Sequence, residues 1–513
     1  MSEIFAEAPP LEPAIDKRDP MPRLDDASDR ISPIVVKEVR QFVRGREFIY
    51  SFGACLIVAV AVAFYASADA LGGNSTSGAW SFTTLTLSLA FLGLAVVPIG
   101  AYSALRNERM ELTFDLISLT TLSSRRILIG KLLSQGVKLV TLFAVMAPFI
   151  AMSFLLGGVD FVTILTTLAM VFLGSMWMAA AALFLSTLHK SRAMSGVMLG
   201  ALGIVLFLFF NFARTFLLRG VPGLAGPFSS WSSWSSVVIW SAVCLVTMMN
   251  LILLAENRLA LPTEDRVTSL RIGFLVQFLL IVGLALRSVL WGSPFGGAVW
   301  WLGFAGGFNL AAVAMFAVTE GLAVPRMPLA PKWSRWPLRW GVPILGPGGG
   351  RAAAFVIVQM AALLTAAWLL DADWSGLRWL LAICGFICLF TGMPALVLDH
   401  LEERGMRPFH ARVAILVLVL LSLILPDVVY YVVWRPEVFS LEFEYRHLFN
   451  PLRTIADWDK VEMLGWQALP LIFASSGFVF YLALMLIAAR RRTSAEPSAA
   501  SGLEAGAPQT HHP

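Results

Sequence analysis

The sequence predicts an all-α protein: a transmembrane bundle of about twelve helices, with both the N-terminus and the C-terminus in the cytoplasm. Three observations support this prediction. Of the 513 residues, 58% are hydrophobic and only 14% are charged, whereas soluble domains carry about 25% charged residues. Apolar runs of about 20 residues, the length that crosses a bilayer as a helix, recur along the chain. Lys and Arg collect in alternate connections between these runs.

The apolar runs without central charge give the twelve predicted spans. In the first half they are Phe48 to Ala66, Phe82 to Leu105, Leu132 to Leu156, Val162 to Leu185, Ala193 to Leu218 and Val237 to Ala255. In the second half they are Ile272 to Leu290, Val299 to Val318, Ala352 to Leu370, Leu377 to Leu398, Val413 to Val433 and Trp466 to Ala489.

The direction of each span follows from its flanking cations, because Lys and Arg stay on the cytoplasmic side in short loops. Cations precede the first span, fill the connection from Arg106 to Lys131, and follow the last span at Arg490. The connection from Asp69 to Trp80 has none and is predicted to face outward. The outer segment from Arg435 to Trp466 does carry cations, balanced by acids, but longer loops escape the charge rule. We expect a multi-pass protein of the cell membrane, with a bacterial inner membrane as the usual setting for this layout.

The two ends of the chain differ from the apolar middle in composition. Residues 1–30 are rich in Pro, Ala and acids and lack the apolar core of a signal peptide. Residues 493–513 are rich in Ser, Ala and Pro. Both are predicted to be disordered cytoplasmic extensions. Between them we expect a six-span domain at 31–260, and an appended six-span domain or diverged repeat at 261–492.

A basic amphipathic helix is predicted directly before the first span. Ile31, Val35, Val39, Phe42 and Val43 recur at helical spacing, and polar residues occupy the other side of the helix. Such a helix lies in the membrane interface with its cations near anionic headgroups. A solvated segment beside the membrane is the alternative interpretation. The residues assigned to this interfacial helix are Lys37, Arg40, Phe42 and Arg44.

The segment from Arg106 to Lys131, between the second and third spans, is too polar to cross a membrane. Its apolar residues form two helical stripes, one through Phe114 and Ile117 and another through Leu116 and Leu119. A helix that is apolar on two sides and lies outside the bilayer needs one partner in its own bundle and a second protein beneath it.

This pattern resembles the permease subunits of type-2 ABC exporters, which carry an interfacial helix before the first span and a coupling helix between the second and third. Leu112 and Thr121 depart from the family pattern, which commonly has Gly and Pro at these two positions. The resemblance covers about residues 31–255. The matching motifs, in the family's order, are Glu108-Arg109, Thr113, Asp115-Leu116-Ile117, Leu122-Ser123 and Gly130-Lys131.

The resemblance implies that a separate ABC ATPase docks on the helix from Glu108 to Leu119 and drives export of a substrate. The residues assigned to this coupling helix are Glu108, Arg109, Thr113, Phe114, Asp115, Leu116 and Ile117. ATP would be bound by the partner subunit, so no cofactor, metal or catalytic residue is expected in this chain. It has no phosphate-binding loop motif, and its Gly346 to Gly350 run lacks the motif's Lys. The lipid bilayer is a further expected partner, and no nucleic acid is. If the second half is an appended domain, the resemblance implies a second permease chain in a homo- or heterodimer, whereas a diverged repeat would let one chain complete the pathway alone.

Two other classes of function remain as alternatives, a membrane enzyme similar to lipid-linked glycosyltransferases and a non-transporting scaffold. The acids of the outer segment 437–462 are the candidate residues for an enzyme. An ion-coupled transporter is disfavoured, because the polar residues at membrane depth are mainly the uncharged Gln277, Asn309 and Gln359. Such residues more often join helices by hydrogen bonds than bind ions.

Overall fold

The computed structural model describes most of the predicted spans and some of their connections. The described residues are 33–73, 77–110, 124–157, 159–188, 192–220, 231–259, 267–291, 297–318, 345–346, 349–370, 373–402, 454–455, 457–463, 465, 468, 471–472 and 475–487. Almost all of these residues are helical, and none of them belongs to a β-strand. The all-α prediction is therefore confirmed for this part of the chain.

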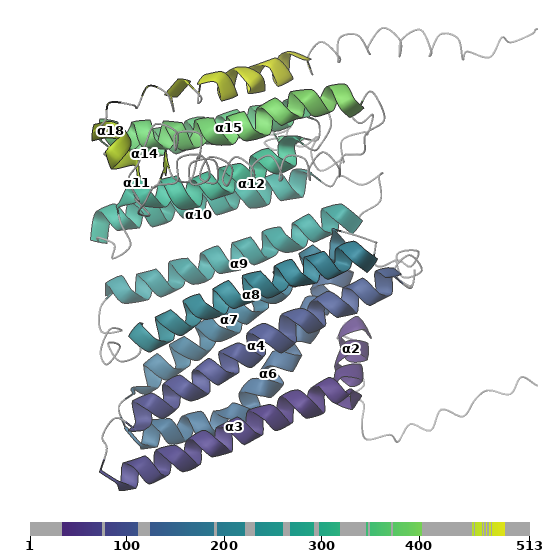
Figure 1. The fold of residues 1–513 in the computed structure, drawn as a ribbon, viewed down its shortest axis with the longest axis vertical. Coiled ribbons are helices and arrows are strands. Elements are labelled where there is room, and N and C mark those ends of the chain that lie inside the picture. The colour runs from purple at the N-terminus through teal and green to yellow at the C-terminus, as the bar shows by residue number, and fades with distance from the viewer. Residues whose placement is uncertain are drawn as a thin grey trace, which may run out of the picture.

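The first half of the chain forms a row of long helices that run side by side (Figure 1). The short helix α2 lies across the end of this row, where α4 ends and α6 begins. The seven helices are α2 (Pro33–Arg44), α3 (Arg46–Leu71), α4 (Ser77–Met110), α6 (Ser124–Leu155), α7 (Phe161–Thr187), α8 (Arg192–Gly220) and α9 (Trp231–Leu259).

The second half continues the row (Figure 1). One span contains a five-residue π-helix, η3, between two α-helical parts. The elements are α10 (Thr268–Trp291), α11 (Ala298–Trp301), η3 (Leu302–Gly306), α12 (Gly307–Val318), α14 (Gly349–Leu369), α15 (Trp374–Glu402), α18 (Trp458–Met463) and a further apolar helix, Ser475–Ile487.

Nine helices of the described residues are long and apolar enough to cross a membrane. They coincide with nine of the twelve predicted spans. The predicted fifth span is the helix α8, whose apolar part covers Ser195–Phe207, and Ser475–Ile487 covers part of the predicted twelfth. The predicted eleventh span, Val413 to Val433, lies outside the described residues. The fold is that of a multi-pass membrane protein.

The helix α4 is the centre of the first half, because it packs against α3, α6, α7 and α8. Small residues allow this close packing. An added Cβ on Gly93 would lie 2.9 Å from Ser175 Oγ and 3.1 Å from Leu139 Cδ1. At the start of α4, an added Cβ on Gly78 would overlap the backbone carbonyl of Gly157. A side chain at either position would push neighbouring helices apart.

The helix α9 contacts both halves of the chain, since it packs against α7 on one side and α10 on the other. Ile252 and Ala255 belong to an apolar core with residues of α4, α6 and α7. Leu253 and Leu254 belong to a second core with residues of α10, α12, α14 and α15. The predicted domain boundary at 260 thus falls directly after a helix that contributes to both cores.

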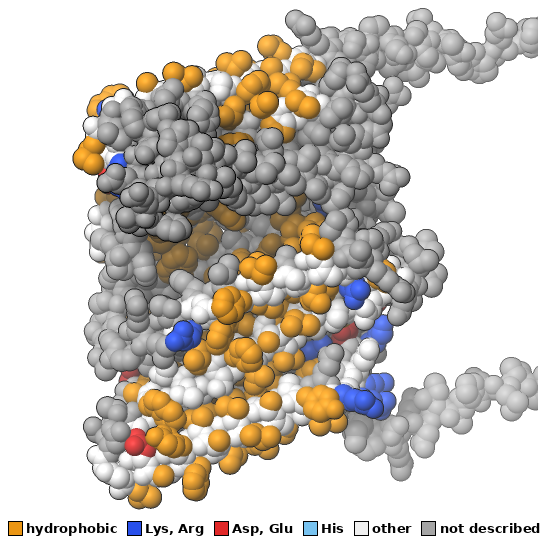
Figure 2. All heavy atoms as spheres, in the orientation of Figure 1, with side chains coloured by type: hydrophobic (Ala, Val, Ile, Leu, Met, Phe, Trp, Pro, Cys, Tyr) orange, Lys and Arg blue, Asp and Glu red, His pale blue; other side chains and the backbone are white. Residues whose placement is uncertain are grey.

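Many large apolar side chains on the sides of the helices face outward, as Figure 2 shows for one face of the molecule. On α3, Ile57 is 71% exposed and Phe64 is 76% exposed. Lys and Arg side chains visible in this view gather mainly near the end where α2 lies. Apolar sides with charged ends are what a bilayer requires, since hydrocarbon covers the sides and water or headgroups reach the ends.

Candidate functional site

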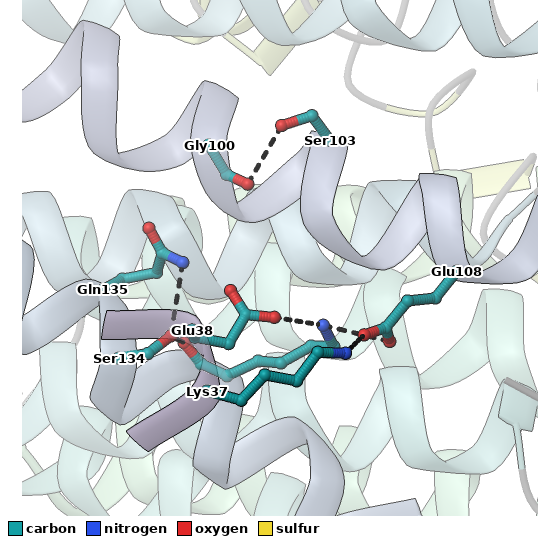
Figure 3. A network of polar contacts seen from close by, with 8 residues as sticks. Lys37, Glu38, Gly100, Ser103, Glu108, Ser134 and Gln135 are labelled. Carbon is teal, nitrogen blue, oxygen red and sulfur yellow. Dashed lines mark hydrogen bonds and ion pairs between the residues drawn. The ribbon is translucent and has the colours of Figure 1, made fainter. Parts of the chain in front are cut away.

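Four charged residues from three helices meet at the end of the bundle where α2 lies; we call Lys37, Glu38, Glu108 and Lys131 the charge cluster (Figure 3). Lys131 Nζ of α6 lies 2.8 Å from Glu38 Oε1 of α2 and 3.0 Å from Glu108 Oε2 of α4. Lys37 Nζ of α2 lies 3.6 Å from Glu108 Oε1. Lys131 therefore joins α2 and α4 through one ammonium group.

Lys131 is the most enclosed member of the charge cluster, with only 1% of its side chain exposed. The side chains of Glu38 and Glu108 are 10% and 15% exposed, and that of Lys37 is 63% exposed. Two cations and two carboxylates give a net charge of zero. Burial of charges costs several kcal/mol per ion unless they are paired. Burial of Glu38, Glu108 and Lys131 is therefore favourable only while these three side chains remain in contact.

A second contact holds α2 against α6. Phe42, one helical turn after Glu38, is buried, and Lys138 Nζ lies 5.0 Å from the centre of its ring. An ammonium group at this distance from an aromatic face is attracted by the ring electrons. Phe42 also packs edge to face against Phe48 of α3, with 5.4 Å between ring centroids. The helix α2 is thus fixed at two levels along α6.

The end of α4 is also tied to the neighbours on its other side. Arg109 Nη1 donates a hydrogen bond to the Ser186 carbonyl in α7, with a distance of 2.7 Å. The Tyr102 hydroxyl donates to the Ser195 carbonyl in α8, with a distance of 2.8 Å. The last three turns of α4 are therefore connected by polar contacts to α2, α6, α7 and α8.

The four residues predicted for the interfacial helix all lie on α2. Lys37, Arg40 and Arg44 are exposed on α2, whereas Phe42 is buried against α3 and α6 and not among acyl chains, where the interfacial prediction put the apolar side. Val43, predicted to belong to the apolar side, is 50% exposed. Val35 is buried and Val39 is half-buried, whereas Ile31 lies outside the described residues.

The predicted coupling residues are divided between described and undescribed parts of the chain. Glu108 and Arg109 form part of the last turn of α4, where both point into contacts with other helices. Thr113, Phe114, Asp115, Leu116 and Ile117 lie outside the described residues. Their assignment to an ATPase-docking helix stays a prediction.

Two members of the charge cluster, Glu38 and Lys131, were absent from the predicted site. A signal for Glu38 was present in the sequence, because it lies three residues after Val35 and four before Phe42, on the same helical stripe. An acid in the apolar stripe of a basic helix indicates a buried cationic partner. Lys131 was noted only as part of a motif and as a cation of the connection after the second span.

The geometry of the charge cluster indicates a mechanical connection between helices. Its ammonium and carboxylate groups are already occupied by one another, and they link the two helices that flank residues 111–123. Among the described residues, no group of three or more His, Cys, Asp or Glu side chains is placed to hold a metal ion.

Comparison with protein-family models, with curated proteins and with solved structures found no match to this chain.

Proposed function

We propose that this chain is the membrane-spanning permease subunit of an ABC exporter, powered by ATP hydrolysis in a separate ATPase subunit. In this proposal the ATPase docks on the segment that starts at Glu108 and continues to Leu119. The charge cluster then lies on the cytoplasmic side, both termini are cytoplasmic, and the protein acts in a bacterial inner membrane together with a second permease chain.

The observation that carries the proposal is that the charge cluster joins the two helices that flank residues 111–123 in the sequence. This segment is joined to the end of α4 on one side and to the start of α6 on the other. Glu108 is three residues before the segment, and Lys131 is eight residues after it. The ion pair between them joins the ends of α4 and α6.

The contacts of the charge cluster could transmit a displacement of residues 111–123 to the membrane-spanning helices. A displacement of the segment acts on α4 and α6 together, because Lys131 holds their ends to each other. The helix α2 moves with them, since Glu38 binds the same ammonium group. The Arg109 and Tyr102 contacts carry the displacement to α7 and α8. Chains of packed helices and ion pairs are the physical route by which separate sites are coupled.

Co-purification from gently solubilised membranes tests the proposal. The expected result is that an ATPase subunit is retained with the parent protein and lost with the variants Phe114→Glu and Asp115→Lys. Phe114→Glu puts a charge at an apolar position that the docking partner is predicted to cover. Asp115→Lys reverses a charge in the same segment. Matched controls are Phe161→Glu and Asp160→Lys at the start of α7, which lie beyond the opposite end of α6. The controls are expected to retain the ATPase.

Recovery of the parent protein without any ATPase would contradict the transport proposal. An activity that the isolated chain shows by itself on a lipid-linked substrate would favour the membrane-enzyme alternative instead. Loss of the ATPase from the controls as well as from the two segment variants would show that binding does not depend on residues 111–123.

A further inference from the structure

Two uncharged polar side chains are buried in the second half of the bundle without a hydrogen-bond partner among the residues that the structure describes. Asn309 of α12 is 1% exposed and Gln359 of α14 is 2% exposed. Neither the amide nitrogen nor the amide oxygen of either residue has a partner among the described residues. The expectation that such amides more often join helices by hydrogen bonds is not met by these two among the described residues.

Some other buried polar side chains do have partners, although single hydroxyl atoms of Thr86 and Ser175 in the first half have none among the described residues. Asn250 Nδ2 of α9 donates to Gln277 Oε1 of α10 at 2.6 Å, so the prediction is confirmed for Gln277. The hydroxyls of Thr391 and Tyr481 lie 2.8 Å apart. A buried amide left without a hydrogen bond costs about 1 to 3 kcal/mol per polar group. Asn309 and Gln359 together have four such groups, which is a large cost for packing alone.

The helices of this region can be aligned through their closest contacts. An added Cβ on Gly303 would overlap the Trp379 ring, and one on Gly307 would lie 2.9 Å from Ile383. Both pairs differ by 76 in residue number, so the span of η3 and α12 runs parallel to α15. The helix α14 must run opposite to α15, because residues 370–373 alone connect them. Consequently α12 and α14 are antiparallel.

This alignment puts the two amides at nearly the same level. Gly306 packs directly on Leu363, where an added Cβ would lie 2.5 Å from Leu363 Cδ1. Asn309 is three residues beyond Gly306, about 4.5 Å along the axis, and Gln359 is four residues before Leu363, about 6 Å along the axis. Since the helices are antiparallel, both displacements point the same way. Both residues also lie on the face of their helix that makes this contact.

The level is the middle of the membrane-spanning region. Gln359 is at the centre of the span Gly350–Leu369, and Asn309 is within two residues of the centre of Ala298–Phe316. The π-helix η3 ends three residues before Asn309. Single-turn π-helical insertions occur frequently at functional sites, because they displace the residues that follow them from regular packing. An isolated amide pair at mid-bilayer depth is expected to have a ligand from outside the protein.

We propose that Asn309 and Gln359 form a binding site at the centre of the second bundle for a small uncharged hydrogen-bonding molecule, either water or a hydroxyl-bearing solute. An uncharged ligand matches the site, because two amides offer donors and acceptors without net charge. A ligand that both donates and accepts satisfies an amide on each helix and bridges α12 and α14. The inference does not depend on the transport function.

Water-edited solid-state NMR of the full-length protein in lipid bilayers tests the site. We expect rapid transfer of water magnetisation to the side-chain amides of Asn309 and Gln359, and slow transfer to Gln277, whose partner is Asn250. Thermal unfolding with and without ethylene glycol distinguishes the two sources of hydroxyl. Stabilisation of the parent protein by the glycol, and not of the double variant Asn309→Leu, Gln359→Leu, identifies a solute site.

The stability of the leucine variants provides a second readout with a predicted sign. If a ligand satisfies the amides, Asn309→Leu and Gln359→Leu lower the unfolding temperature. If the amides are simply unpaired, leucine removes their desolvation cost and the unfolding temperature rises. The proposal is overturned when neither water transfer nor glycol stabilisation is seen and the leucine variants are at least as stable as the parent protein.

Discussion

Replacement of Lys131 by methionine tests whether the charge cluster holds the end of the bundle together. The side chain of Lys131 is 1% exposed and contacts Glu38 and Glu108 at 2.8 and 3.0 Å. Methionine fills much of the same volume but removes the charge, so it leaves two carboxylates facing each other in an enclosed site. The variant therefore has uncompensated buried charge and not merely one lost contact.

The size of the effect follows from this enclosure. Unit charges 4 Å apart attract by about 4 kcal/mol at an effective dielectric constant of 20, and both pairs here are shorter. Removal of one partner from a buried ion pair costs about 3 to 5 kcal/mol. We expect Lys131→Met to lower the free energy of unfolding by this amount. Lys37→Met removes a cation that is 63% exposed and 3.6 Å from its partner, and such pairs contribute only about 0 to 1 kcal/mol.

Reversible unfolding in mixed micelles, followed by tryptophan fluorescence, measures these differences. A triple variant, Lys131→Met with Glu38→Gln and Glu108→Gln, provides the decisive comparison. It has no unpaired buried charge, since Lys37 is 63% exposed, and is expected to recover most of the lost stability. Equal stability of Lys131→Met and Lys37→Met would refute the reasoning. Failure of the triple variant to recover would show that Lys131 acts through packing and not through charge.

Two further predictions concern the opposite end of the first bundle. Gly78→Ala is expected to destabilise the protein strongly, since its Cβ would overlap the Gly157 carbonyl. Gly53→Ala is the control, because a Cβ at Gly53 meets nothing within 4 Å. Thermal unfolding of the two variants tests this prediction, and equal effects would contradict it. Asp160 caps α7 by accepting a hydrogen bond from the Thr163 backbone N–H at 3.0 Å, so Asp160→Ala is expected to cost about 1 kcal/mol. Partial burial raises the pKa of the Asp160 carboxyl, but hydrogen bonds, mainly from Thr163, outweigh it and leave the pKa below its usual value. The folded-state pKa is thus depressed. The cap's contribution to the free energy of unfolding should be complete above the unfolded pKa of about 3.9 and disappear as the pH falls through the folded pKa. An unchanged difference in free energy of unfolding between the parent and Asp160→Ala below that range would contradict this.

Length and hydropathy were sufficient to predict the nine spans that the described residues contain, because the bilayer imposes a similar helix length on every crossing. The helix α3, for example, extends beyond the predicted span by only two residues before Phe48 and five after Ala66. The interruption of one span by η3 could not be predicted from composition. A π-helical turn depends on how Gly303 and Gly306 pack against Trp379 and Leu363, and these contacts are distant in sequence.

The charge cluster was predictable in part. The amphipathic pattern placed Phe42 on the apolar side of α2 and Lys37 on the polar side, but not the contact of the apolar side with α6. The pairing of Glu38 with Lys131 joins residues 93 positions apart, and no local pattern specifies which of several cations an acid will meet. Glu108 was assigned to a helix beneath the membrane, yet its carboxylate lies between Lys37 and Lys131.

The long sequence separation between Glu38 and Lys131 has a consequence for biosynthesis. When the ribosome has made α2 and the first two spans, the lysine that neutralises Glu38 has not yet been translated. Glu38 must remain hydrated at the membrane surface until the third span has emerged and inserted. The helix α2 can therefore lock into place only after three spans are present, so that its docking marks completion of this part of the bundle during assembly.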